Sequence, residues 1–216
     1  MIVNYPRMRR RATWPDDLNT ALEFSSANPF SISAPKSWDN KLEYTNGSGW
    51  KTWDGSKINS GTTESKNVIY IRGVGNTKVT GLSGGWTITG QEISCNGNIE
   101  RLLNWEDVES GKHPKMASYC YRSMFYGCTS LTAAPSLPAT TLEMRCYTAM
   151  FYGCTKIKLS TAASGTYTKS YRIPKSGTGT TASGALDNMF ANTGGTFKGT
   201  PTINTTYYLD KSNTIV

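Results

Sequence analysis

Residues 120–129 read Cys-Tyr-Arg-Ser-Met-Phe-Tyr-Gly-Cys-Thr, and residues 146–155 read Cys-Tyr-Thr-Ala-Met-Phe-Tyr-Gly-Cys-Thr. The two stretches lie 26 residues apart and share eight of their ten residues. A repeat period of about 20–50 residues indicates units that stack on one another. A divergent third copy occupies residues 185–193, and its Met-Phe pair follows that of the second copy by 39 residues. The spacing predicts about three repeats, with an insertion at about residues 160–180.

Each copy is expected to form a short helix, because Cys120 and Met124 are i, i+4 neighbours on one apolar stripe. Gly127 and Gly153 should end the first two helices, and Asn192 takes the equivalent place in the third copy. Glycine and asparagine readily adopt the left-handed conformation that ends a helix. A short extended segment is expected after the first helix, at residues 131–133.

The repeat units should stack, because a single unit cannot bury its apolar stripe alone. Phe151→Ala is then expected to cost roughly 3–5 kcal/mol, since the stripe would be closed on both sides. The predicted repeat core consists of Cys120, Met124, Phe125, Cys146, Met150, Phe151, Met189 and Phe190.

The chain has five cysteines, and four of them recur with the motif. Cys120 and Cys128 would lie about 12 Å apart along one helix, whereas a disulfide needs α-carbons within about 7 Å. Buried free thiols are therefore expected. A zinc site is disfavoured, because no Cys-x2-Cys pair is present and His113 is the only histidine.

The sequence motif of the repeat resembles that of a known family. Residues 124–132 read Met-Phe-Tyr-Gly-Cys-Thr-Ser-Leu-Thr, and residues 137–142 read Leu-Pro-Ala-Thr-Thr-Leu. Both stretches are similar to the BspA-type leucine-rich repeat of bacterial surface proteins, in the form found on virion proteins of phages of gut bacteria. The resemblance covers about residues 95–216. It implies a display scaffold with no shared active site.

The preceding part of the chain divides in two. Residues 1–20 form a basic arm in which Arg7, Arg9, Arg10 and Arg11 supply half of the formal net charge of +8. Such an arm binds nucleic acid, an anionic membrane or an acidic protein patch, or is a solvated tail. We expect it to anchor the chain on an acidic partner, with nucleic acid disfavoured because aromatic residues are scarce beside the arginines.

Residues 21–110 are expected to form a β-sandwich-like domain, because short alternating runs recur between turn signals. The expected strands include residues 22–24, 30–32, 42–44, 68–71 and 86–88. Residues 111–216 would then be a leucine-rich-repeat-like solenoid. The fold class predicted for the whole chain is mainly β with short helices.

All six tryptophans precede residue 106, and tryptophans at an exposed surface stack on sugar rings. Most are expected in the core or at the rim of the sandwich. Trp50 and Trp53, which lie beside glycine-rich turns, are the candidates for glycan stacking.

The sequence offers little for catalysis or cofactor binding. His113 precedes a proline in a lysine-rich loop, where a surface position is expected, and no phosphate loop or nucleophile elbow is present. We therefore expect no enzyme, no cofactor and no metal.

Two function classes remain open. The first is a structural protein of a phage virion, a head fibre, decoration or tail-tip protein, that attaches to a host surface protein or glycan. It would be assembled in the host cytoplasm, would contact other virion proteins through the arm, and would form homo-oligomers. The second is a bacterial cell-surface or secreted adhesin, or a carbohydrate-binding module. The start of the chain lacks the apolar core of a signal peptide, and no apolar run is long enough to span a membrane. We therefore favour the virion surface and expect no membrane insertion.

Overall fold

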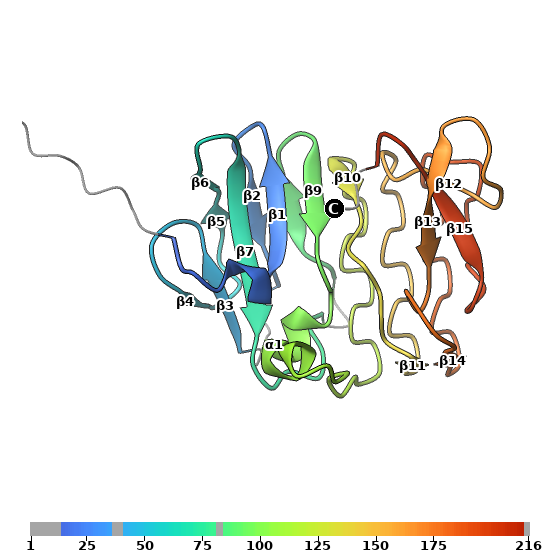
Figure 1. Ribbon diagram of the computed structural model, residues 1–216, viewed down its shortest axis with the longest axis horizontal. Coiled ribbons are helices and arrows are strands. Elements are labelled where there is room, and N and C mark those ends of the chain that lie inside the picture. Colours follow the sequence, from blue (N-terminus) through green and yellow to red (C-terminus); the bar gives the residue numbers. More distant parts are fainter. Residues whose placement is uncertain (1–13, 36–40, 81–83, 214–216) are drawn as a thin grey trace, which may run out of the picture.

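The structure of the chain, a computed structural model, describes residues 14–35, 41–80 and 84–213. It is mainly β, with several antiparallel or mixed sheets, one α-helix, α1 (Arg101–Glu109), and one 3-10 helix, η1 (Leu18–Thr20) (Figure 1). In this coarse form the predicted fold class is confirmed. Neither helix of the described part is long and apolar enough to cross a membrane.

The largest sheet has seven strands in the order β10-β9-β1-β7-β3-β4, with β6 paired to β7. Its pairs are antiparallel except for β10 with β9. The strands are β1 (Leu22–Ser26), β3 (Leu42–Thr45), β4 (Lys51–Trp53), β6 (Gly61–Thr62), β7 (Asn67–Gly73), β9 (Ile93–Asn96) and β10 (Leu131–Ala133).

A second sheet has three strands and contributes to the same core. Its members, in the order β5-β2-β8, are β5 (Ile58–Asn59), β2 (Ser31–Ser33) and β8 (Thr87–Thr89). Phe24 of β1 and Trp53 of β4 both contact Trp86, which precedes β8, with ring centroids 6.1 and 5.0 Å apart. All five strands predicted from alternating runs in this region are present, as is the extended segment predicted at residues 131–133.

Two further small sheets are formed by segments between and after the motif copies (Figure 1). One pairs β11 (Thr141–Leu142) with β14 (Thr180–Thr181) in parallel, and the other places β15 (Thr206–Asp210) between β12 (Leu159–Ser160) and β13 (Tyr167–Arg172). The residues predicted as an insertion therefore include β13, which pairs along its length with the closing strand.

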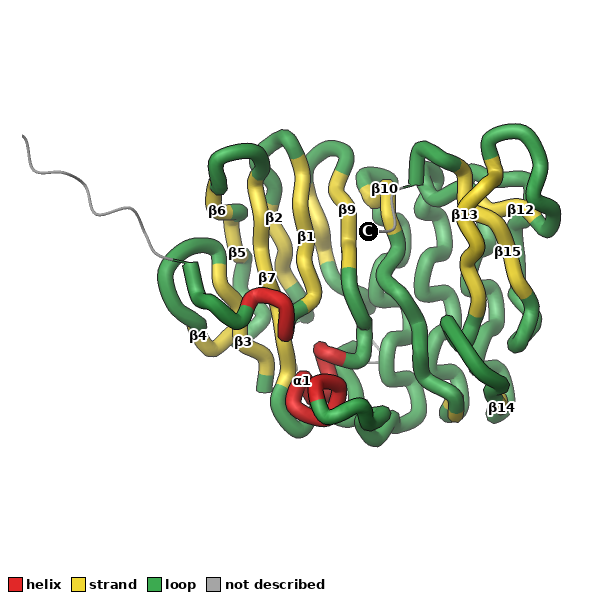
Figure 2. The backbone as a smooth tube through the Cα atoms, viewed as in Figure 1, coloured by secondary structure: helices red, strands yellow, loops and turns green. Residues whose placement is uncertain are grey.

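The motif copies are not helices, and that expectation is wrong. In Figure 2 residues 120–129 and 146–155 run as loop, and their backbone is a series of turns. The reason is a left-handed residue at every fourth position, Tyr119, Ser123 and Gly127 in the first copy, with φ of 64°, 54° and 69°. An α-helix requires negative φ throughout, so no helix forms.

One hydrophobic core extends across the boundary predicted near residue 110. A single cluster of buried side chains reaches from Leu22 to Leu209. The two sides of the boundary are also joined by hydrogen bonds, since the amides of Val79 and Trp86 donate to the carbonyls of Cys120 and Met124 at 2.9 Å. The first motif copy therefore packs directly against the strand region.

Candidate functional site

The motif copies are joined by a ladder of backbone hydrogen bonds that uses every second amide. Residues 121, 123, 125 and 127 donate to the carbonyls of residues 146, 148, 150 and 152 at 2.7–2.9 Å. Residues 147, 149, 151 and 153 donate in the same way to residues 185, 187, 189 and 191, at 2.8–2.9 Å. The intervening amides turn back within their own copy, as Met124 does to the carbonyl of Tyr121 at 3.1 Å. The turn backbone is thus as fully hydrogen-bonded as a sheet would be.

The left-handed positions make this ladder geometrically consistent from copy to copy. Gly127, Gly153 and Asn192 have φ of 69°, 73° and 57°. The prediction that glycine and asparagine adopt a left-handed conformation here is confirmed, although no helix ends at these residues. Ser123 and Ala149 share the conformation, with φ of 54° and 53°, although neither residue type favours it.

Identical side chains of successive copies lie directly on one another. The rings of Phe125, Phe151 and Phe190 are stacked at centroid distances of 5.4 Å, with interplanar angles of 10° and 4°. Tyr121 and Tyr147 form a second stack at 5.5 Å. All eight residues predicted as repeat core are fully buried. Each phenylalanine ring is therefore removed from water and packs against its counterpart in the next copy.

The five cysteines are free and buried. Burial raises the pKa of the Cys146 thiol to about 12, and it raises the pKa of Cys154 as well. The Cys154 thiol donates to the carbonyl of Phe125 at 3.0 Å, which links two copies. These thiols are protonated at neutral pH and act as packing groups. Within the described residues no group of three or more His, Cys, Asp or Glu side chains could hold a metal ion.

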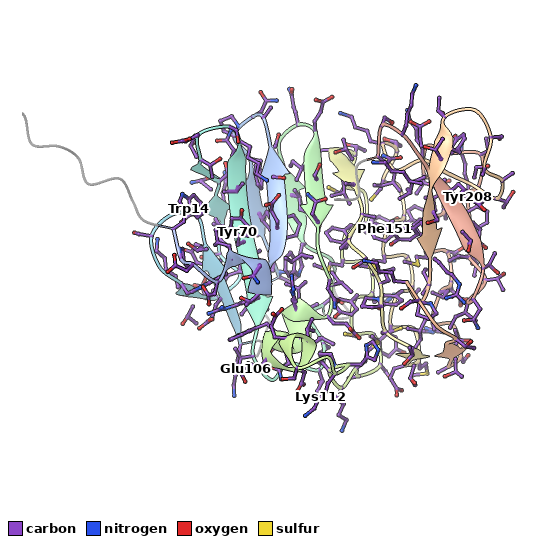
Figure 3. All side chains as sticks on the ribbon, viewed as in Figure 1. Trp14, Tyr70, Glu106, Lys112, Phe151 and Tyr208 are labelled. Carbon is purple, nitrogen blue, oxygen red and sulfur yellow. The ribbon has the colours of Figure 1, made fainter. Side chains whose placement is uncertain are left out.

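The stack presents one aromatic pair to solvent. The rings of Tyr126 and Tyr152 are nearly parallel and stacked at 4.7 Å, with Tyr126 54% exposed and Tyr152 half-buried. Sequence reasoning missed this pair, although the signal was present, because tyrosine precedes glycine in both of the well-preserved copies. Phe151, labelled in Figure 3, is fully buried in the same stack. The stack thus has a buried aromatic column and a partly exposed tyrosine pair.

The two tryptophans predicted for glycan stacking do not present free faces together. Trp53 is only 2% exposed, donates its indole N–H to the carbonyl of Ser56 at 2.7 Å and packs on Trp86. The prediction is therefore wrong for Trp53, because it pairs in the sheet with the buried Leu42 and lies with it on the core face. Trp50 is half-buried, and the Arg72 guanidinium covers one face of its ring at 3.9 Å.

Arg72 is the centre of a polar cluster on the outer face of the large sheet. Its buried guanidinium lies between the rings of Trp50 and Trp105 and forms ion pairs with Asp17 and Glu43. Cation–π contacts of a desolvated arginine contribute about 2 kcal/mol or more. Sequence reasoning missed this cluster, because its members are separated by up to 88 residues.

Two other predicted features remain, the arginines of the arm and His113. The arm residues Arg7, Arg9, Arg10 and Arg11 lie outside the described residues. His113 is exposed, as expected, but its Nδ1 lies 2.9 Å from the buried carboxylate of Glu100. Burial raises the pKa of Glu100, and the contact with His113 opposes that shift only in part.

The surface of this chain thus combines an exposed tyrosine pair on stacked turns with a polar cluster on a sheet. The polar cluster includes Trp50, one of the two tryptophans predicted for glycan stacking, whereas Trp53 lies in the core. In comparisons with protein-family models, curated proteins and solved structures, the chain matches none of them.

Proposed function

We propose that the chain is a non-enzymatic structural protein of a phage virion, a head fibre, decoration or tail-tip protein. It displays a repeat domain for attachment to the host surface. Its fold is then a sandwich-like N-terminal part followed by a short leucine-rich-repeat-like solenoid of about three copies. The proposal extends the resemblance of residues 95–216 to repeats on phage and bacterial surface proteins.

The observation that carries the proposal is the stack of motif copies with its exposed tyrosine pair. The ladder of alternate amides and the buried phenylalanine column fix the copies relative to one another. Tyr126 and Tyr152 stack on each other at 4.7 Å, which reduces the side-chain entropy that the pair loses on binding. Tyrosine is enriched at recognition surfaces because it combines a large apolar area with a polar tip.

The arm supplies the other half of the proposal, the contact with the particle. Four arginines within five positions favour an acidic protein partner. A protein displayed on a particle needs one anchored end and one free surface, and the arm and the tyrosine pair meet these two needs. Other virion proteins and further copies of this chain are the proposed partners at the anchored end.

The alternative is a bacterial cell-surface or secreted adhesin, or a carbohydrate-binding module. The same exposed aromatic pair supports it, since stacked tyrosines serve an adhesin as well as a virion protein. The two proposals differ in where the chain resides, on an assembled particle or on a bacterial envelope.

Antibodies raised against the purified chain separate the proposals. Labelling of purified phage particles in electron micrographs supports the virion protein, whereas labelling of uninfected cells supports the adhesin. Deleting residues 1–12 should leave the chain folded but abolish its incorporation into particles. Incorporation at normal copy number would show that the arm is not the anchor.

The role of the tyrosine pair is tested by competition. Purified chain should reduce adsorption of the phage to its host, and Tyr126→Ala with Tyr152→Ala should abolish this effect. Tyr167→Ala, a change to a half-exposed tyrosine outside the stack, is the matched control. Equal competition by both variants would remove the tyrosine pair from the attachment surface.

A further inference from the structure

The outer face of the large sheet contains a hollow of about 680 Å³ that the proposed function does not use. Ligand-binding pockets typically have volumes of about 300–1,000 Å³. Strands β1, β7 and β9 form its floor, with Arg101 of α1 on its wall. The polar and aromatic residues of its lining that bear on binding are Glu23, Lys66, Tyr70, Ser94, Asn96 and Arg101.

The alternation of the strands places a polar row on this floor. Leu22 and Phe24 of β1 are buried in the core, so Glu23 between them points to the other face. In the register of the sheet, Glu23 lies opposite Tyr70 of β7 on one side and opposite Asn96 of β9 on the other. Three adjacent strands therefore contribute a carboxylate, a phenol and an amide to one line.

The charges of the hollow are balanced. The Glu23 carboxylate accepts hydrogen bonds from Lys66 Nζ at 2.7 Å and from the Tyr70 hydroxyl at 3.0 Å. Partial burial favours the neutral form of Glu23, but the hydrogen bonds from its neighbours outweigh burial and lower its pKa, so it is ionised. The Arg101 guanidinium is paired with Glu109 at 2.8 Å. An anionic or a cationic ligand would find no unmatched charge here, so the lining favours a neutral ligand.

Two polar atoms of the lining residues have no hydrogen-bond partner. They are Asn96 Oδ1, an acceptor, and Arg101 Nε, a donor, and both are buried. Unpaired buried polar atoms are unfavourable by about 1–3 kcal/mol each. A hydroxyl is one group that can both donate and accept, so a ligand rich in hydroxyls can satisfy both atoms once the two side chains turn toward the hollow.

The ring of Tyr70 forms an aromatic wall beside the polar row, and Trp14 packs on it from outside the lining. Tyr70 is half-buried, and Trp14 contacts its ring edge to face at 5.9 Å. Figure 3 shows both labels on the front of the large sheet. Aromatic rings beside hydroxyl-binding groups match a sugar, which has an apolar C–H face and a rim of hydroxyls.

We propose that this hollow is a binding site for a neutral saccharide. The biological role of the site rests on the proposed function, since a virion attachment protein meets sugars on the host surface. The chemistry of the site does not, because it follows from the balanced charges, the unpaired atoms and the aromatic wall. The site is separate from Trp50 and Trp53, where glycan stacking was predicted.

The test is a binding titration of the purified full chain by calorimetry. The probes are neutral hexose and N-acetylhexosamine oligosaccharides, with sialylated and sulfated oligosaccharides as charged counterparts. We expect the neutral probes alone to bind. Asn96→Ala should weaken binding by at least about tenfold, the value of roughly 1.4 kcal/mol of lost hydrogen bonding.

A matched control and a second variant keep the result interpretable. Thr52→Ala changes an exposed residue of β4 outside the hollow and should leave binding unchanged. Ser94→Tyr should fill the hollow and abolish binding, and thermal melting checks that each variant is folded. Binding of charged probes only, absence of binding to every neutral probe, or neutral binding that survives Ser94→Tyr would each overturn the inference.

The failure of this inference is distinguishable from failure of the proposed function. If the antibody labels particles but the chain binds no neutral saccharide, the saccharide site alone is refuted. A chain that binds saccharide at the hollow, with no labelled particle, would support this inference and remove the virion assignment. A dimer that dissociates on Ser94→Tyr in analytical ultracentrifugation would identify the hollow as a contact between copies and overturn the inference.

Discussion

The strand region and the motif stack solve the same problem, the burial of backbone and apolar side chains, in different ways. In the strand region, partners are distant and dissimilar, as when Leu22 pairs with Ile71 in an antiparallel ladder. In the stack, partners are equivalent residues of successive copies, so phenylalanine lies on phenylalanine and tyrosine on tyrosine. A repeat thus obtains complementary packing from identity alone, whereas a sheet needs a particular partner at each position.

The largest effect is expected from breaking the phenylalanine column. Phe151→Ala removes the central ring, which is stacked on both sides, and should lower the free energy of unfolding by about 3–5 kcal/mol. Urea denaturation followed by circular dichroism measures it. Tyr152→Ala, a change to the partly exposed ring of the next residue, is the control. A loss for Phe151→Ala no larger than the control would show that the column does not hold the stack.

The equivalent test of the strand region removes its polar centre. Arg72→Met keeps most of the side-chain volume but leaves Asp17 and Glu43 without their cation. We expect a loss of about 2–3 kcal/mol, below the value for a fully buried pair because both carboxylates are partly exposed. Lys156→Met breaks an exposed pair at 4.0 Å and should cost less than about 0.5 kcal/mol. Similar losses for the two variants would contradict a special role for Arg72.

A smaller effect on stability is expected from substitutions at the left-handed residues of the second copy. Gly153→Ala should destabilise by about 1 kcal/mol, because its φ is 73° and an added Cβ would lie 3.4 Å from Gly127 Cα. Ala149→Gly should have the opposite sign, with a gain of up to about 1 kcal/mol, since alanine already occupies a φ of 53°. Thermal unfolding of both variants measures the difference. Losses of equal size would show that φ does not limit the stack.

The cysteines give the smallest effect, a change in reactivity without a change in stability. Because burial raises the pKa of the motif thiols, the native protein at pH 8 should react slowly with a thiol reagent. After denaturation without reductant, five thiols per chain should be titrated. Rapid reaction of the native protein would mean that the copies separate readily. Fewer than five thiols after denaturation would indicate disulfides.

The sequence predicted which residues of the repeat are buried but not the backbone that buries them. The spacing of Cys120 and Met124 fits one face of a helix, and it fits a turn with a four-residue period equally well. The decisive left-handed residues include Ser123 and Ala149, whose types do not indicate positive φ. The side-chain pattern therefore indicated the repeat period, but it did not indicate the turn conformation of the backbone.

For the candidate site, the sequence could not predict the register in which the strands pair. The run at residues 22–24 predicted a strand, but nothing in the chain order places Glu23 between Tyr70 and Asn96, which are 47 and 73 residues away. The exposed pair of Tyr126 and Tyr152 was within reach, because an aromatic side chain repeats at a fixed offset. The prediction of an exposed Trp53 was wrong because its glycine-rich surroundings indicated a turn. The sequence did not indicate the short strand that places this side chain on the core face.

The ladder of alternate amides also bears on how the molecule can change over generations. Each copy donates through one face and accepts through the other with the same atoms, so a further 26-residue copy between the first and second would find both faces already complementary. Such an insertion would lengthen the stack by about 4.8 Å, the spacing of hydrogen-bonded strands. The length of the stack can thus change by whole copies, because each added copy makes the same contacts as the existing ones.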